Sequence, residues 1–167
     1  MKKISVVIPV RNRMDNLKGA VKANLKQTFI KNYDEIIVVD YGGEDDTKKM
    51  LKRFNDKRIR YIYVNEKGVW NLPRARNVGI KNSNGELVMC VDADMILSSG
   101  ILEKVYEDFK RRKKSVLYQI PRRDIMKDGS IRLYPAGVYP GDFQATSREN
   151  WFKVRGFDER MTGYGYE

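Results

Sequence analysis

The stretch GELVMCVDADMIL (residues 85–97) decides the fold, because an apolar run ends abruptly in two acids. Residues 87–91 are all apolar, and Asp92 and Asp94 follow them, separated by Ala93. A short, continuous apolar run is typical of a strand buried on both faces of a sheet. Carboxylates resist burial unless they are paired or bind a metal. The stretch therefore predicts a central strand that presents two acids to a ligand at its carboxyl end.

The rest of the chain alternates short β-branched runs with longer segments of helical period. This order predicts one α/β domain with a mostly parallel sheet flanked by helices. The expected strands are 4–10, 35–40, 59–64, 86–92 and 115–120, and the expected helices are 16–27, 46–54, 73–81 and 99–110. After Pro121 the turn pair Asp128-Gly129 predicts a short antiparallel hairpin.

Polar residues follow three of the expected strands. The three segments are PVRNR (9–13), DYGGEDD (40–46) and DAD (92–94). Carboxyl ends of parallel strands meet at one edge of a sheet, and open α/β sheets bind ligands there. The Gly42-Gly43 turn would let a nucleoside approach the backbone. The segment PRARN (73–77) adds two guanidinium groups at a helix start, which favours an anionic ligand.

Composition narrows the chemistry. The chain has no His and one Cys, which excludes Ser-His-Asp and Cys-His catalysis, zinc sites of Cys and His, and a disulfide framework. Any metal must be bound by oxygens, as Mg²⁺, Mn²⁺ or Ca²⁺ are. The net charge of +11 favours anionic partners: nucleic acid, a phosphorylated substrate or a membrane surface. No apolar run approaches the roughly 20 residues of a membrane span, so we expect a cytoplasmic protein, with the inner membrane surface as a further location.

Four motifs, in order along the chain, resemble the glycosyltransferases of the GT-A (nucleotide-diphospho-sugar transferase, Rossmann-like) fold, especially family 2. They are ISVVIPVRNR (4–13), DEIIVVDYGGEDDT (34–47), RARNVGIKNSNGELVMCVDAD (74–94) and GDFQATSRENWFKVRGFDERMTGYGYE (141–167). The pieces WNLPRARNVGI and GFDERMTGYGYE are also similar to the β-1,4-galactosyltransferase and chondroitin-polymerase type of GT-A domain. The resemblance implies a metal-dependent, inverting transfer of sugar from a UDP-sugar to a hydroxyl group. The implied acceptor is a glycan, acidic glycans included, or a lipid-linked molecule, and no nucleic acid is expected.

The resemblance also implies roles for individual positions. The implied nucleotide-sugar contacts are Pro9, Val10, Arg11, Asp40, Tyr41, Arg76, Asp92 and Ala93. In these roles Pro9, Val10 and Arg11 border the base, and Arg76 approaches the diphosphate. Asp94, with Asp92, would bind Mn²⁺ or Mg²⁺ in the family's DxD motif. Asp142, Tyr164 and Tyr166 would lie on the acceptor side. Tyr41 stands where the family often has a second acid, and we expect it to stack on the base instead.

The catalytic base is the main departure from the family pattern. In the family an aspartate follows the Glu of this last motif and deprotonates the acceptor, whereas this chain stops at Glu167. We therefore expect a single GT-A domain, 1–167, truncated at its C-terminus, with Glu167 as the substitute base. Three alternatives stay open: a donor-binding but inactive fragment, a sugar nucleotidyltransferase, and a basic nucleic-acid-binding module. Nucleotidyltransferases generally carry a Gly-rich loop after the first strand, and PVRNRMDN contains no glycine.

Overall fold

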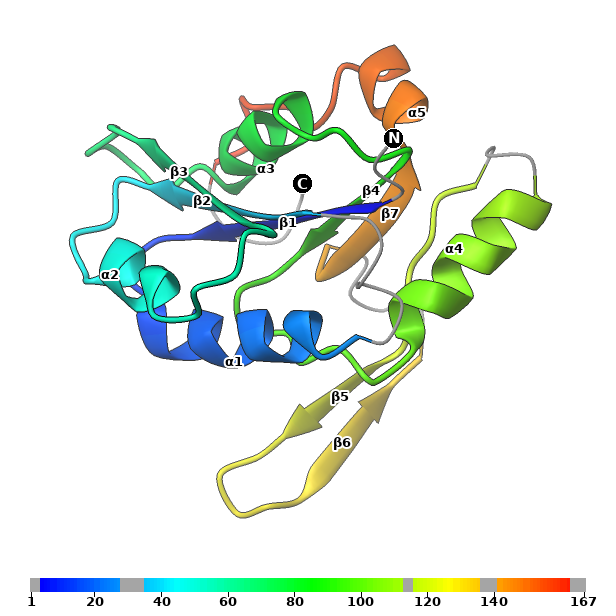
Figure 1. The fold of residues 1–167 in the computed structure, drawn as a ribbon, viewed down its shortest axis with the longest axis horizontal. Coiled ribbons are helices and arrows are strands. Elements are labelled where there is room, and N and C mark those ends of the chain that lie inside the picture. Colours follow the sequence, from blue (N-terminus) through cyan, green and yellow to red (C-terminus); the bar gives the residue numbers. More distant parts are fainter. Residues whose placement is uncertain (1–3, 28–34, 113–115, 136–140, 163–167) are drawn as a thin grey trace.

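The computed structural model describes residues 4–27, 35–112, 116–135 and 141–162, and a mostly parallel sheet forms its centre (Figure 1). The strands are β1 (Ile4–Val10), β2 (Glu35–Tyr41), β3 (Ile59–Val64), β4 (Leu87–Val91), β5 (Arg122–Ile125), β6 (Ile131–Tyr134) and β7 (Phe143–Ser147). The central sheet has the order β3-β2-β1-β4-β7, while β5 and β6 form a separate antiparallel hairpin. Within the central sheet, β7 alone runs antiparallel to its neighbour. The predicted fold class and hairpin are confirmed.

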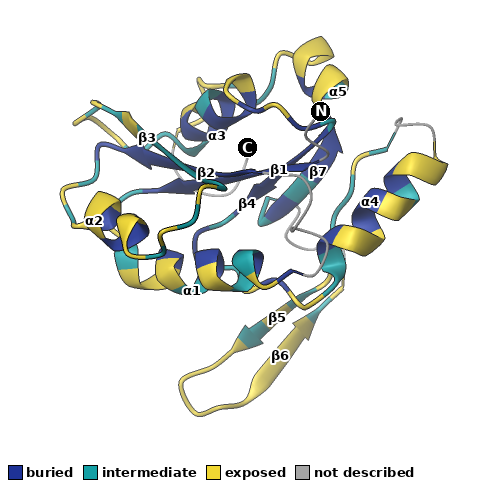
Figure 2. Ribbon diagram, viewed as in Figure 1, coloured by how far each residue is buried: buried dark blue, intermediate teal, exposed yellow. Residues whose placement is uncertain are grey.

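Helices cover both faces of this sheet (Figures 1 and 2). They are α1 (Met14–Leu25), α2 (Thr47–Lys52), α3 (Leu72–Lys81), α4 (Ile101–Arg111) and α5 (Arg148–Lys153). Helices α1, α2 and α4 pack on one face through residues such as Leu17, Met50 and Phe109, and α3 and α5 pack on the other through Ala75 and Trp151. Every residue of β1, β2 and β4 is buried, which explains their continuous apolar sequences. No helix in the described ranges is long and apolar enough to cross a membrane.

The expected strand at 115–120 is the one predicted element that the structure contradicts. Of its described residues, 116–120, only Tyr118 pairs, through an isolated antiparallel bridge to Ala145 with backbone hydrogen bonds of 2.7 and 3.1 Å. The edge beside β4 is taken instead by β7, which pairs with β4 along its whole length. Sequence analysis missed β7 because its sequence, FQATS, is short and half polar. The other expected strands and helices agree with the structure to within two residues at each end.

The close approach of α3 to the sheet depends on Gly79. A Cβ at this position would lie 2.1 Å from Cγ1 of Val7 on β1, a distance that no side chain tolerates. The glycine therefore lets the helix backbone rest directly on the central strand. This contact fixes how far the side chains at the start of α3 extend beyond the carboxyl ends of the strands.

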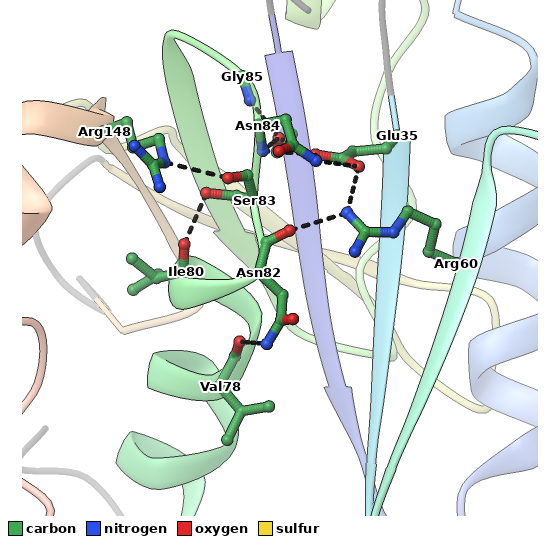
Figure 3. Close-up of polar contacts among 10 residues, drawn as sticks. Glu35, Arg60, Val78, Ile80, Asn82, Ser83, Asn84, Gly85 and Arg148 are labelled. Carbon is green, nitrogen blue, oxygen red and sulfur yellow. Dashed lines mark hydrogen bonds and ion pairs between the residues drawn. The ribbon is translucent and has the colours of Figure 1, made fainter.

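A polar network closes the opposite, amino end of the sheet (Figure 3). Its centre is the buried carboxylate of Glu35, which accepts hydrogen bonds from the Ser5 hydroxyl (2.8 Å) and the Asn84 amide (2.7 Å). Arg60 forms an ion pair with the same carboxylate (2.6 Å) and donates to the carbonyl of Asn82 (2.8 Å). One buried acid thus joins β1, β2, β3 and the loop between α3 and β4.

Replacing Glu35 with alanine should lower the free energy of unfolding by about 2–4 kcal/mol, because the buried Ser5 hydroxyl and the Asn84 amide lose their acceptor and Arg60 loses its charged partner. Urea unfolding followed by circular dichroism measures the change. Glu44→Ala is the matched control, since Glu44 forms an ion pair with Lys67 in which both side chains are largely exposed. The control should unfold near the wild-type midpoint. Equal losses in the two variants would contradict the role of the network.

Candidate functional site

A pocket of about 360 Å³ opens at the carboxyl ends of β1 and β4. Three segments line it: the end of β1 with the loop after it, the residues around the start of α3, and the residues directly after β4. The lining residues are Pro9, Val10, Arg11, Asn12, Arg13, Trp70, Leu72, Asp92, Ala93 and Asp94. Six of the residues expected to bind nucleotide-sugar or metal therefore line one cavity. The position agrees with the rule that open α/β sheets bind ligands beyond the carboxyl ends of their strands.

Asp92 is the inner acid of the pocket. Its Oδ1 accepts a hydrogen bond from Nη2 of Arg76 at 2.8 Å, and its backbone N–H donates to the carbonyl of Asp142 at 3.2 Å. Burial raises the pKa of Asp92 to about 6, although the Arg76 guanidinium acts in the opposite direction. The nearby carboxylates of Asp142 and Asp94 raise it further. The site therefore holds negative charge that a cation would stabilise.

Asp94 is the outer acid. About half of its side chain is exposed, and its Oδ2 pairs with Nη1 of Arg13 at 3.1 Å. Arg13 belongs to the loop after β1, so this ion pair spans the pocket from one strand end to the next. Because both partners are well exposed, the pair is weak and open to exchange with a ligand.

Arg76 lies behind the pocket rather than in it. Its side chain is fully buried, and besides Asp92 it donates to the carbonyl of Gly141 at 2.6 Å. The guanidinium also lies 5.1 Å from the centre of the Phe157 ring. Arg74 extends outward instead and pairs with Glu66 at 3.5 Å. The cations that line the pocket are thus Arg11 and Arg13, not the two arginines of α3.

Asp40 and Tyr41 lie in the core beside the pocket and do not line it. Tyr41 is 1% exposed, so its ring offers no face to a ligand in this structure. The buried carboxylate of Asp40 accepts from the Gly43 amide (3.0 Å) and the Tyr61 hydroxyl (2.7 Å), and burial raises its pKa. Gly42 has a φ of 70°, and a Cβ there would lie 1.8 Å from the Glu66 carbonyl oxygen. The glycine turn is therefore required by the protein's own backbone.

Trp70 is the pocket aromatic that sequence analysis missed. It lines the cavity beside Pro9 and Val10, and its ring lies edge-on to that of Tyr41 with 5.8 Å between the centroids. The expected aromatic contact with the base is thus available from Trp70, with Tyr41 behind it. A large aromatic two residues before the start of α3 was the sequence signal for this position.

The loop after β1 is tied to its neighbours by side chains that also line the pocket. Arg11 donates to the carbonyl oxygens of Gly68 (2.7 Å) and Lys67 (3.3 Å). Asn12, with a left-handed φ of 53°, accepts from the Glu44 amide at 2.8 Å. These contacts hold the loops after β1, β2 and β3 together at the rim of the cavity.

The segment after α5 is held against α3 by Asn77. Its side-chain oxygen accepts from the Phe157 amide (2.8 Å), and its side-chain nitrogen donates to the Phe157 carbonyl (2.9 Å). Asp142, expected on the acceptor side, forms an ion pair with Arg122 of the hairpin. The other expected acceptor residues, Tyr164 and Tyr166, and the expected base Glu167 lie outside the described residues.

The carboxylates of the pocket suit a metal whose remaining ligands come from a substrate. In the described ranges no group of three or more Asp, Glu, Cys or His side chains is arranged to hold a metal ion. Asp92 and Asp94 alone line the cavity as acids. Mg²⁺ in proteins is commonly held by one or two carboxylates together with substrate phosphates. The donor set therefore fits a metal that binds together with a diphosphate.

Two solved structures share this fold. Staphylococcus aureus TarS 1–349 in complex with UDP superposes with a TM-score of 0.80 at 18% identity, over 96% of this chain and 52% of that one. The mannosyltransferase PcManGT from Pyrobaculum calidifontis, in complex with GDP-Man and Mn²⁺, superposes with a TM-score of 0.69 at 16% identity, over 94% and 48% of the two chains. These likenesses confirm the GT-A fold.

Two curated relatives are similar to this chain in sequence. Glycosyltransferase GlyG of Streptococcus pneumoniae is 32% identical over 136 residues, which cover 80% of this chain and 44% of GlyG. The GalNAc(5)-diNAcBac-PP-undecaprenol beta-1,3-glucosyltransferase of Campylobacter jejuni is 26% identical over 98% of this chain and 57% of its own length. The chain thus spans about half the length of these relatives. The sequence profile described as Glycosyl transferase family 2 matches residues 5–164, and the chain belongs to that family.

Proposed function

We propose that this chain binds a UDP-sugar and a divalent metal in the pocket and transfers the sugar, with inversion, to a hydroxyl group. The observation that carries the proposal is the meeting of Asp92, Asp94, two arginines and Trp70 in one cavity at the carboxyl ends of the strands. Family membership and the UDP complex of TarS support it. Membership also favours a transferase over the nucleotidyltransferase alternative.

Asp94 would bind the metal directly, and Asp92 would be the second protein ligand. Mn²⁺ or Mg²⁺ fits two carboxylate oxygens, and the complex of PcManGT contains Mn²⁺. When bound, the metal supplies positive charge that stabilises a departing diphosphate. Arg76 would act behind the pocket by fixing the orientation of Asp92. Arg11 and Arg13 would provide cations on the other side of the cavity.

The base of the nucleotide would pack against Trp70. The indole lies between the end of β1 and the start of α3, where Pro9 and Val10 give the cavity an apolar wall. An aromatic ring stacks on any nucleobase, so it supplies affinity more than base identity. Uridine is proposed from the family and from the UDP complex of TarS.

The acceptor is proposed to be a glycan or a lipid-linked molecule. The Campylobacter relative is named for an undecaprenol-linked substrate, which supports the lipid-linked class. In an inverting transfer the acceptor oxygen attacks the anomeric carbon, the bond to the diphosphate breaks, and a base takes the hydroxyl proton. Glu167 is the proposed base. Donor binding without transfer would identify the chain as a donor-binding piece of the enzyme.

Calorimetric titration of UDP, with and without Mn²⁺, tests the donor site. Wild-type binding should strengthen with Mn²⁺, and Asp94→Asn should weaken Mn²⁺-dependent binding at least about tenfold, because one oxygen ligand loses its charge. Asp46→Asn is the control, since Asp46 forms an exposed ion pair with Lys49 away from the pocket. The proposal would be overturned if the affinity of the folded chain for UDP changed neither with Mn²⁺ nor with Asp94→Asn.

Trp70→Ala should weaken UDP binding about tenfold by removing the stacking surface, while Trp70→Phe should keep most of the affinity. The comparison ligand is pyrophosphate with Mn²⁺, which has no base and should bind the three proteins alike. Calorimetry gives the affinities, and thermal unfolding checks that each variant is folded. A loss of pyrophosphate affinity as large as the loss of UDP affinity would show that Trp70 does not contact the base.

Arg76→Gln should lower the free energy of unfolding by about 3 kcal/mol, because Asp92 loses the cation that offsets its burial. The double variant Arg76→Gln/Asp92→Asn should recover part of this loss, since no charge then remains unpaired. It should not recover Mn²⁺-dependent UDP binding. Urea unfolding and calorimetry give the two quantities. Fully additive losses of stability in the double variant would contradict the coupling of the two residues.

A further inference from the structure

The β5–β6 hairpin exposes an aliphatic outer face, and its opposite, inner face carries Arg122, Asp124, Arg132 and Tyr134. Residues opposite each other in an antiparallel pair share a face, so Arg123 and Leu133 lie on the same side as Ile125 and Ile131. All four are exposed, with values of 79% for Ile125, 61% for Ile131 and 68% for Leu133. Figure 2 shows the hairpin as a largely exposed arm that extends away from the sheet and helices. A surface hairpin normally has the reverse arrangement, with its polar face in water.

The inner face is held in place by ion pairs. Arg122 pairs with Asp142 and with Asp124 (2.8 Å), and its guanidinium lies 5.1 Å from the centre of the Tyr134 ring. Because an isolated two-stranded hairpin is marginally stable in water, this anchoring matters for the orientation of the arm. It fixes the base of the hairpin to the domain through Arg122, while Ile125, Ile131 and Leu133 lie on the opposite face and stay exposed.

Basic residues surround the exposed apolar face. Arg123 lies on that face, and Lys127 lies in the exposed turn beside Asp128. Arg132 lies on the opposite face, opposite Asp124, and is also exposed. The whole chain carries a net charge of +11. Exposed aliphatic side chains beside cations are complementary to a bilayer with anionic headgroups, which offers an apolar interior beneath a negative surface. A second copy of this chain would bring like charges together, so self-association through this face is disfavoured.

We propose that the outer face of the β5–β6 hairpin docks this domain on an anionic lipid bilayer, with Ile125, Ile131 and Leu133 inserted among the lipids. Docking does not depend on the proposed function. The two are nevertheless connected in space, because Arg122 of the hairpin pairs with Asp142, whose carbonyl accepts from the Asp92 amide. Membrane docking would therefore bring the pocket close to a lipid-linked acceptor.

Co-sedimentation with vesicles tests the proposal. The chain is mixed with vesicles of phosphatidylcholine alone, or of phosphatidylcholine and phosphatidylglycerol in equal parts. The wild type should sediment with the mixed vesicles and little with phosphatidylcholine. Ile125→Ser/Ile131→Ser/Leu133→Ser should reduce the partition coefficient at least about tenfold. The control Phe152→Ser/Val154→Ser removes two exposed apolar side chains, 47% and 65% exposed, at α5 on the other side of the sheet, and should bind like the wild type.

A labelled variant keeps the test informative if the triple variant misfolds. An environment-sensitive fluorophore on Leu133→Cys should shift to the blue with mixed vesicles, whereas one on Val154→Cys should not, and the native Cys90 is buried from the reagent. Unchanged vesicle binding by the folded triple variant, absence of wild-type binding, or a dimer that the triple variant abolishes would each overturn the proposal. UDP titration of the triple variant separates this result from the donor site, which the hairpin substitutions should leave intact.

Discussion

The ion pair between Arg76 and Asp92 is the interaction on which the site depends. It resolves the conflict in the central strand, where a fully buried β4 ends in a carboxylate. An unpaired acid there would be costly, and so would a buried guanidinium without an acid. The same guanidinium binds the Gly141 carbonyl just before β7 and lies against Phe157. One pair of charges therefore fixes α3, the end of β4 and the two segments that follow β6 and α5.

The two ends of the sheet show how the chain separates stability from function. At the amino end, Glu35 is enclosed by donors that all belong to the protein, so its network is complete without a ligand. At the carboxyl end, Asp92 is satisfied on its inner side by Arg76, while Asp94 faces the cavity with a partly exposed side chain. A buried acid, Glu35, thus lies at one end of the strands and a partly buried acid, Asp92, at the other, and only the second end leaves an acid for a ligand to neutralise.

Site residues that directly follow a predicted strand could be placed from the sequence alone. Residues whose position depends on tertiary packing could not. The apolar run before Asp92 and the loop 9–13 could be assigned directly, because strand ends determine where they meet. Arg76 was expected to approach the diphosphate, and only the structure, with Gly79 in close contact with Val7, shows that this face of α3 is buried. Tyr41 is the last residue of β2 and stays in the core, and Trp70 lines the pocket instead. Strand β7 carries no apolar run, and its pairing with β4 is a property of the tertiary fold.

The pairing of Asp94 with Arg13 bears on how donor and metal would bind. A metal alone must displace Arg13 from the carboxylate and leave its guanidinium without that partner. A diphosphate alone would meet Arg11 and Arg13 but also the negative charge of two aspartates. When both bind, the diphosphate supplies oxygens to the metal and a new anion to Arg13, so each removes the cost that the other incurs. In the proposed function, metal and nucleotide-sugar thus bind together and replace the ion pair between Asp94 and Arg13.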